Sequence, residues 1–389
     1  MTQTSAFDDV QIDDLREIGG VKWSTFPDKV GAFVAEMDFG IAPPITQALH
    51  AAVEIGGFGY LPQAVGKRLS AAFTEWSRDR YQWDVPAENV RPLADVIAGL
   101  EIAIQHFSSP GSAVIVPTPA YMPFLTVPGA LGRDLIQVPM AFRDGRYVYD
   151  LDALDAAFEA GGNLLILCNP HNPIGRVLDR GELEAITAVV DRHRGRVFSD
   201  EIHAPLIYPG GKHTPYASTS VVAAGHTVTA TSASKAWNLA GMKCAQLVLS
   251  NEADKELWST VGMMGEHGAA NLGVIANTVA YTVGGQWLDN VIAYLDISRR
   301  ALEKLVQQHL PGVSYTPPEG TYLAWLDCRA LDLGGQEAAE FFMERAGVAM
   351  TDGAQCGDVG RGFVRYNFAT PRPIMEQTIE AMGKALATR

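Results

Sequence analysis

The chain has few cysteines, no long apolar run and no excess of positive charge. Its four cysteines, Cys168, Cys244, Cys328 and Cys356, are scattered and form no Cys-x-x-Cys pair. This argues against a disulfide framework or a zinc site and fits a reducing compartment. No run of ~18 apolar residues is present, so we expect no membrane span. The formal net charge of −14 argues against nucleic acid or an anionic membrane as the main partner.

The first twenty residues, MTQTSAFDDVQIDDLREIGG, are acidic and lack the apolar core of a secretory signal. Together with the cysteine pattern, this predicts a cytoplasmic protein. A hydrophobic content of 47% and a charged content of 19% are typical of a folded domain. At 389 residues the chain is too long for one simple core, so two domains are expected.

Short apolar runs alternate with helical patterns along most of the chain. Helices are expected over 94–107 and 179–194, and Asp179 followed by Glu182 resembles a capping box at the start of the second. Buried strands are expected at 112–119, 163–170, 195–202, 227–234 and 245–250. This alternation predicts an α/β protein with a largely parallel sheet.

The pattern changes after about residue 285. A long helix is expected over 286–310 and ends before Pro311. The segments beyond it indicate a smaller α+β domain.

Four of the expected strands end directly in polar, proline-rich or glycine-rich turns. These turns read PTPAY, CNPHNPIG, SDEIH and SASK. In open α/β sheets ligands bind at the carboxyl ends of the strands, so we expect the reactive residues there.

The stretch TSASKAWNLAGMK contains two lysines among small hydroxyl residues. A neutral lysine amine such as that of Lys235 forms Schiff bases with carbonyl compounds. Ser232, Ser234 and Lys243 are donors suited to a phosphate. The two features together suit a phosphorylated aldehyde, of which pyridoxal 5'-phosphate (PLP) is the common one. Taken alone, the stretch is equally well a solvated loop.

Two further motifs supply polar groups at strand ends. Asp200 lies at the end of an expected buried strand, where a cation such as a protonated pyridine nitrogen would balance its charge; the alternative is a carboxylate that caps the next turn. Asn169 and Asn172 lie among prolines that fix the loop, so an amide there is a rigid donor. The loop by itself is equally consistent with a plain turn.

Other candidates are weaker in isolation. Tyr121 is suited to stacking on a flat ring or to ordinary packing. The amides of Val96 and Ile97 start a helix and face an anion or only water. Arg365 lies in an apolar strand-like run, where it binds a substrate carboxylate or forms an internal salt bridge.

The order of these motifs resembles the fold-type I PLP-dependent enzymes of the aminotransferase class I/II superfamily, over nearly the whole chain. The resemblance implies a large PLP-binding domain over 48–288, with a mainly parallel seven-stranded sheet between helices. Residues 1–47 and 289–389 would form a smaller α+β domain.

The resemblance also implies roles for single residues. Lys235 would form the Schiff base, Asp200 would pair with the pyridine nitrogen, Tyr121 would stack on the ring, and Lys235, Asp200 and Tyr121 would be the catalytic residues. The remaining cofactor contacts would come from Val96, Ile97, Asn172, His203, Ser232, Ser234, Lys243 and Tyr60. Arg365, Asn172 and Asp38 would bind the substrate. Tyr60 would reach the phosphate across the interface of a homodimer with shared active sites, and no metal is expected.

The segment KWSTFPDKVGAFVAEMDFGIAPPITQAL is similar to the opening of the MalY/PatB group of cystathionine β-lyase-like enzymes. SDEIHAPLIYPGGKHTPYAS resembles that group too. Two residues depart from the group's pattern: Glu36 replaces the usual aspartate, and Asp95 replaces a frequent glycine. Asp95 beside a phosphate is unfavourable unless its side chain points away or caps the helix.

The implied activity is an α,β-elimination that converts an amino-acid thioether, such as L-cystathionine or a related cysteine S-conjugate, into pyruvate, ammonia and a thiol. An aminotransferase of an aromatic or neutral amino acid would need almost the same residues. A regulatory, protein-binding role of the MalY kind is a further alternative.

Overall fold

The computed structural model describes residues 7–388, and a seven-stranded sheet is its largest feature. The strand order is β2-β10-β9-β8-β7-β3-β4. The strands are β2 (Val90–Leu93), β3 (Ala113–Thr118), β4 (Leu135–Pro139), β7 (Gly162–Cys168), β8 (Arg196–Asp200), β9 (Thr227–Thr231) and β10 (Ala245–Leu249). Strand β10 runs antiparallel to both of its neighbours, β2 and β9, and the other neighbouring strands in this sheet, from β9 to β4, are parallel. The expected mainly parallel seven-stranded sheet is therefore confirmed.

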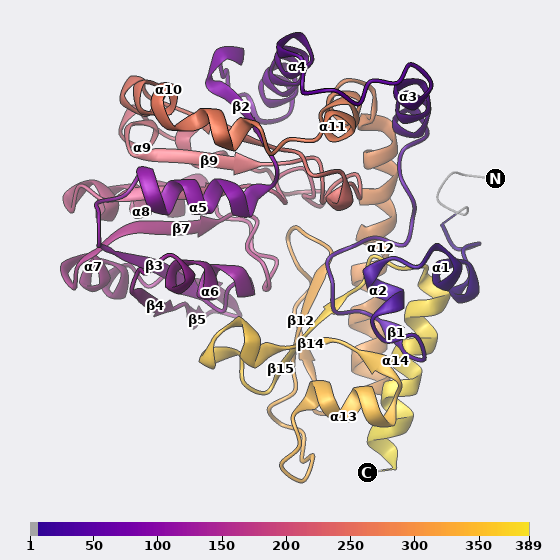
Figure 1. The fold of residues 1–389 in the computed structure, drawn as a ribbon. Coiled ribbons are helices and arrows are strands. Elements are labelled where there is room, and N and C mark those ends of the chain that lie inside the picture. The colour runs from indigo at the N-terminus through magenta and orange to yellow at the C-terminus, as the bar shows by residue number, and fades with distance from the viewer. Residues whose placement is uncertain (1–6, 389) are drawn as a thin grey trace.

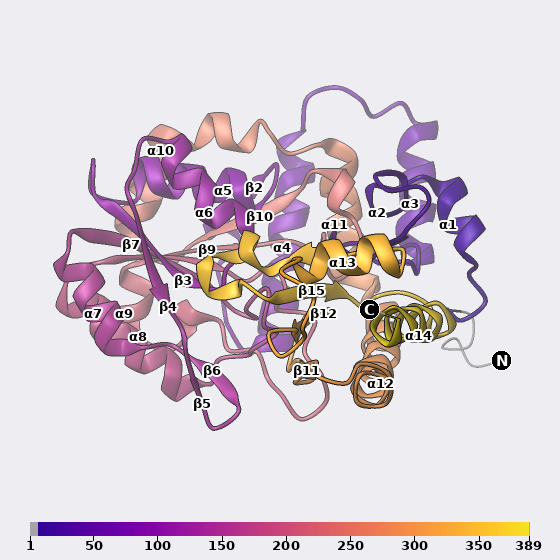
Figure 2. The same cartoon turned by 90° about the horizontal axis from the view of Figure 1, so that it is seen from below.

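Helices cover both faces of this sheet (Figures 1 and 2). One face carries α5 (Val96–His106), α6 (Met122–Ala130) and α10 (Glu252–Glu266), and the other carries α7 (Leu151–Glu159), α8 (Arg180–Arg192) and α9 (Val221–Gly225). Strand β8 shows why both faces must be covered. Phe198 packs into the cluster of Leu100, whereas its neighbour Val197 packs into the cluster of Leu183, because successive strand residues point to opposite faces.

The sequence pattern found the central strands but missed both edges of the sheet. Strand β2 contains Pro92 and pairs only with β10, as expected for an edge, where a missing N–H is tolerated. Strand β4 at the other edge is only partly buried. The buried strands were predicted from continuous apolar runs, and neither β2 nor β4 contains one. Helices α5 and α8 match their predicted ranges, and the Asp179–Glu182 capping box is present.

A second, four-stranded sheet has the order β11-β12-β15-β14. Its strands are β11 (Ser314–Tyr315), β12 (Leu323–Asp327), β14 (Thr351–Asp352) and β15 (Phe363–Asn367), and α13 (Ala338–Arg345) packs near it. The predicted long helix is α12 (Gly285–His309), which lies beside the C-terminal helix α14 (Arg372–Ala387) (Figures 1 and 2). The proposed boundary at 288/289 falls inside the continuous α12, and the domain limits stay a prediction.

The N-terminal segment lies on the side of the molecule that contains the second sheet. After α1 (Ile12–Ile18) and α2 (Val21–Ser24), β1 (Val30–Gly31) pairs with β13 (Val348–Ala349). Gly31 is required there, since a Cβ would stand 1.8 Å from the carbonyl oxygen of Lys22. This pairing brings residues 33–36 to the gap between the two sheets.

The remaining elements are α3 (Pro43–Glu54), α4 (Gln63–Tyr81), α11 (Asn271–Val283) and the hairpin β5 (Ala141–Arg143) with β6 (Arg146–Val148). Helices α3, α4 and α11 lie together at one end of the molecule (Figure 1). None of the helices in residues 7–388 is long and apolar enough to cross a membrane.

Candidate active site

A cavity of about 560 Å³ lies where the carboxyl ends of the large sheet face β14 and β15. Its wall combines the large sheet, the second sheet and the N-terminal segment. The predicted site residues that line it are Val96, Ile97, Tyr121, Asn172, Asp200, His203, Ser234, Lys235, Lys243 and Arg365. The fold thus brings most of the predicted site into one cavity.

Lys235 follows β9 in the SASK turn and lies in this cavity. Its Nζ donates to the carbonyl oxygen of Ala35 at 3.0 Å. Burial and the positive charge of Arg365 lower the pKa of Lys235 to about 8, although Glu36 and Asp200 oppose the shift. A substantial fraction of this amine is therefore neutral, and nucleophilic, near neutral pH.

Asp200 is the last residue of β8 and is 4% exposed. Within residues 7–388, the only hydrogen bond that its carboxylate accepts comes from the N–H of Ile202, at 3.0 Å. Burial, together with the charge of Glu201, raises the pKa of Asp200 to about 7. A cation beside the free oxygen would return this pKa towards its ordinary value.

Arg365 on β15 is 2% exposed, and among the described residues no carboxylate pairs with it. Its Nη1 donates to Asn172 Oδ1 at 3.1 Å, and its Nη2 donates to the carbonyl oxygen of Phe33 at 2.7 Å and to Thr351 Oγ1 at 3.1 Å. Its buried Nε finds no hydrogen-bond acceptor within residues 7–388. Neutral oxygens orient this guanidinium but leave its charge uncompensated, so the internal salt bridge considered above is absent from the described part of the chain. An anion in the cavity would supply the missing charge.

His203 and Tyr121 complete the wall around Asp200. His203 is 2% exposed, and its Nδ1 has no partner in the described part of the chain. Burial and the charges of Lys235 and Arg365 lower the pKa of His203 to about 3, so its ring is neutral. Tyr121 immediately precedes α6 and is half-buried, and burial raises the pKa of its hydroxyl.

The start of α5 forms one end of the cavity. Val96 and Ile97 are its first two residues, and Asp95 is the N-cap whose Oδ1 accepts the N–H of Ala98 at 2.8 Å. The other oxygen of Asp95 forms an ion pair with Lys243 Nζ. Asp95 therefore caps the helix, which was one of the two alternatives considered. It also faces the cavity, where it pairs with Lys243, the cation that was expected to bind a phosphate.

Two predicted residues lie outside the cavity because their polar atoms have other partners. Ser232 is 1% exposed, and its hydroxyl donates to the carbonyl oxygen of Cys244 at 2.7 Å. Asp38 is 5% exposed, and its carboxylate oxygens accept from Lys22 Nζ at 2.7 Å and Trp23 Nε1 at 2.8 Å. The expected substrate contact of Asp38 is thus not supported. Instead, Asp38 links the side chains of Lys22 and Trp23 to the part of the N-terminal segment that reaches the cavity.

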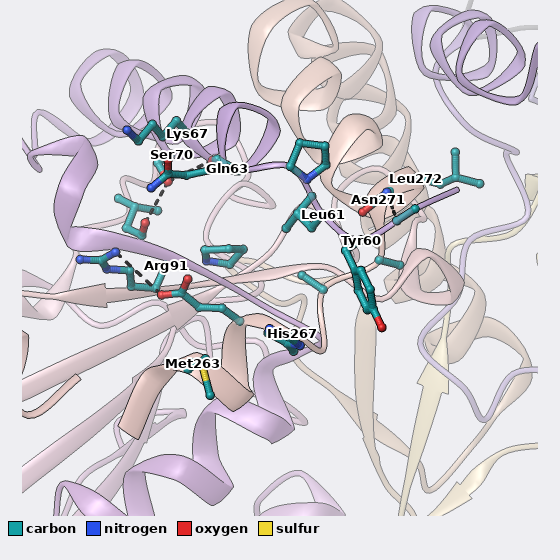
Figure 3. Close-up of a pocket in the computed structure, with 18 of the residues that line it drawn as sticks. Tyr60, Leu61, Gln63, Lys67, Ser70, Arg91, Met263, His267, Asn271 and Leu272 are labelled. Carbon is teal, nitrogen blue, oxygen red and sulfur yellow. Dashed lines mark hydrogen bonds and ion pairs between the residues drawn. The ribbon is translucent and has the colours of Figure 1, made fainter. Parts of the chain in front are cut away.

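Tyr60 lies outside this cavity as well. It is 93% exposed and lines a separate hollow of about 920 Å³. Figure 3 shows it beside Asn271, with its hydroxyl pointing away from Lys67 and Arg91. Asn271 Nδ2 donates to the carbonyl oxygen of Gly59 at 2.7 Å, which fixes the backbone next to Tyr60. Within its own chain Tyr60 does not contribute to the cavity that holds Lys235.

Three groups that position the charged residues were not predicted. They are the backbone carbonyls of Phe33 and Ala35, which accept from Arg365 and Lys235, and the hydroxyl of Thr351. A backbone carbonyl has no side-chain signature, and Thr351 stands in no motif. Only the N-terminal segment's resemblance to a known opening pointed to this region.

Comparison with known proteins agrees with this arrangement. The family model for aminotransferase class I and II matches residues 34–382. The chain is 38% identical to the cystathionine beta-lyase of Corynebacterium glutamicum, over 97% of this chain and 99% of that protein.

Two solved structures share the fold. Cystalysin from Treponema denticola, which contains a pyridoxal 5'-phosphate cofactor, superposes with a TM-score of 0.89 at 30% identity, over 96% of this chain and 97% of that one. The PLP-bound C-S lyase from Staphylococcus hominis gives a TM-score of 0.91 at 28% identity, over 98% of both chains. With a family model that spans the large sheet, the second sheet and the cavity between them, the chain belongs to the aminotransferase class I and II family.

Proposed function

We propose that this protein is a PLP-dependent carbon–sulfur β-lyase. It would release a thiol from Cβ of L-cystathionine or a related cysteine S-conjugate and yield pyruvate and ammonia. The observation that carries the proposal is a single cavity that combines a lysine amine of lowered pKa, a buried carboxylate and an arginine with no acidic partner in the described part of the chain. The names of the relatives favour the lyase over other reactions of the family.

The residues present fit PLP on chemical grounds. The carboxylate of Asp200 accepts only one described hydrogen bond, which suits a protonated ring nitrogen. Lys235 offers a partly neutral amine for the aldehyde. The start of α5 and Lys243 offer N–H groups and a cation for the phosphate. His203 adds a neutral ring with a buried nitrogen that has no partner among the residues that the structure describes.

Arg365 would hold the α-carboxylate of the substrate. Its guanidinium is already oriented by Asn172, Phe33 and Thr351, so little side-chain freedom is lost on binding. Since Asn172 Oδ1 accepts from Arg365, its amide group is turned to donate elsewhere in the cavity. Asn172 would therefore serve both the substrate side and the cofactor side of the site.

When bound, PLP supplies an aldehyde that reacts with amines and a ring that stabilises negative charge at Cα. Asp200 would hold a proton on the ring nitrogen, which strengthens that stabilisation. With the substrate amine bound, Lys235 Nζ would take the proton from Cα as a general base. A pKa of about 8 suits this role near neutral pH.

Loss of the Cα proton would be followed by cleavage of the bond between Cβ and sulfur. The electron pair of that bond leaves with the thiolate, which takes a proton to become the thiol. Lys235 and Tyr121 line the cavity and would be available to donate this proton; Tyr60 would be available only from the second copy of the homodimer proposed below. The released 2-aminoacrylate takes up water and yields pyruvate and ammonia.

An aminotransferase of an aromatic or neutral amino acid is the second candidate, because the same residues serve both reactions and the family bears that name. Incubation with L-cystathionine, with and without a 2-oxo acid, separates the two. A lyase forms pyruvate and thiol without the 2-oxo acid. Strict dependence on the 2-oxo acid would contradict the proposal.

We further propose a homodimer with shared active sites as the working form. Tyr60 is 93% exposed, and the large apolar side chains of Phe58 and Met263 are exposed around the same hollow. Burial of this surface against a second copy would bring Tyr60 to the partner's cavity.

The four free, buried cysteines fit the cytoplasmic location predicted from the sequence.

A further inference from the structure

The residue that departs from the group's pattern at the start of α5 occupies a charged position in the site. Asp95 lines the cavity together with Val96, Ile97 and Lys243. Its two oxygens are both engaged, one by the N–H of Ala98 and the other by Lys243. Burial raises the pKa of Asp95, but the pairing with Lys243 and the nearby N–H groups of Ala98 and Ile97 outweigh it and lower the pKa. Asp95 is therefore an anion inside the region that suits a phosphate.

We propose that Asp95 acts as a built-in competitor of the cofactor's phosphate for Lys243 and the first turn of α5, and so weakens retention of PLP. This inference rests on the proposed function, because it assumes that the phosphate of PLP binds here. It assigns to Asp95 a role in setting how readily the cofactor leaves, rather than a role in the chemistry at Cα.

Charge and exposure decide the direction of the effect. A carboxylate beside a phosphate dianion repels it, and it also neutralises the lysine that would attract the phosphate. The side chain of Lys243 is 57% exposed and that of Asp95 39% exposed, so Lys243 is free to turn from one anion to the other. Loss of the carboxylate should therefore free Lys243 for the phosphate more than it disorders Lys243.

Asparagine separates the charge of Asp95 from its capping role. Asp95→Asn keeps an oxygen that accepts the N–H of Ala98, and asparagine is as good an N-cap as aspartate. Asp95→Ser is a second variant that also keeps a cap and removes the charge.

Asp150 provides a matched control elsewhere in the chain. It is the N-cap of α7, its Oδ1 accepts the N–H of Ala153 at 3.1 Å, and it pairs with Arg143 at 3.8 Å. Asp150→Asn thus removes the same charge from the same kind of position, but away from the cavity.

The test measures binding of PLP, and of pyridoxal, which lacks the phosphate, to the full-length protein freed of cofactor. We expect Asp95→Asn and Asp95→Ser to lower the Kd for PLP about 10-fold, since removing a like charge a few ångströms away is worth at least that much at a partly screened site. The Kd for pyridoxal should stay unchanged, and Asp150→Asn should alter neither value.

A second measurement probes the competition for Lys243. Lys243→Met should weaken PLP binding more strongly in the Asp95→Asn background than in the wild type, because Lys243 is then no longer shared. Unchanged or weaker PLP binding by both Asp95 variants would overturn the inference while leaving the proposed function intact. An equal gain for pyridoxal would overturn it as well. A wild-type protein that binds no PLP would overturn the proposed function and this inference together.

Discussion

At the scale of single residues, the cavity holds two charges with little compensation from the protein. Arg365 is buried among neutral oxygens, and Asp200 accepts one hydrogen bond from the described residues. Burying charges in this way is unfavourable unless a ligand balances them. These buried charges therefore lower the stability of the protein, and they suit the binding of a cation near Asp200 and an anion near Arg365.

Lys235 should be the residue that bonds to the cofactor. Purified protein with PLP should be yellow, and borohydride reduction should attach the cofactor's carbon irreversibly to Lys235 Nζ, as peptide mapping by mass spectrometry would show. Because the pKa of Lys235 is about 8, its neutral fraction grows as the pH rises towards that value. The rate at which cofactor-free protein takes up PLP should thus rise by about eightfold between pH 6.5 and 7.5 and level off above about pH 9. Attachment to another lysine would contradict the assignment, and Lys235→Ala is the control.

Arg365→Lys should lower kcat/KM by roughly 10-fold or more, because lysine keeps the charge but loses the planar fork that grips a carboxylate. Steady-state kinetics with L-cystathionine measures the change. Thr351→Val is a matched control, since it removes only one of the acceptors that orient Arg365, and its effect should be smaller. An unchanged kcat/KM in Arg365→Lys would place the substrate carboxylate elsewhere.

At the scale of elements, the N-terminal segment decides the shape of the site. The pairing of β1 with β13 and the Lys22–Asp38 ion pair carry the carbonyls of Phe33 and Ala35 to the cavity. Both partners of that ion pair are nearly inaccessible, with side chains 1% and 3% exposed. We infer that this ion pair positions the N-terminal segment, which forms one wall of the site.

Asp38→Asn should destabilise the protein by about 3 kcal/mol, because it leaves the charge of Lys22 buried without a partner. Thermal unfolding followed by circular dichroism should show a midpoint lower by about 4 °C. The double variant Lys22→Met with Asp38→Asn should recover part of the loss, since no charge is then left buried. A normal midpoint together with a raised KM would instead assign Asp38 to substrate binding.

At the scale of the whole molecule, the structure of one chain leaves Tyr60 exposed on the rim of a hollow of about 920 Å³ (Figure 3). An exposed tyrosine next to a rigidly held backbone suits a contact with another copy. A twofold dimer places the same patch of both copies in one interface. Such an assembly would make each cavity depend on two chains.

Mixing two inactive proteins, Lys235→Ala and Tyr60→Ala, should restore activity if subunits exchange. In a hybrid dimer one site carries both changes and the other carries neither, so up to about half of its sites should regain activity. Tyr60→Phe alone should weaken retention of PLP, since it removes one hydroxyl donor. Failure to recover activity despite exchange shown by mass spectrometry would mean that Tyr60 serves its own chain.

Local sequence patterns and the family resemblance predicted the central strands, the long helix α12 and ten of the residues that line the cavity. Lys235, Asp200 and Asn172 lie at or just after the ends of buried strands, in short motifs. Neighbouring residues determine both the strand and the turn that follows it. Their convergence follows from topology, because parallel strands bring their carboxyl ends to one edge. The edge strands left no apolar run to find: Arg91 and Pro92 interrupt β2, and β4 is only partly buried.

The pairing of the charged groups in and around the cavity depends on contacts between distant parts of the chain. Lys22 with Asp38, Asp95 with Lys243, and Arg365 with the carbonyl of Phe33 join residues 16, 148 and 332 positions apart. Such pairs leave no periodic or local signal in a single sequence. The same holds for Ser232, whose hydroxyl is directed to Cys244 by packing. Local chemistry names the candidates for a site, but the long-range fold determines which of their atoms remain free to bind a ligand.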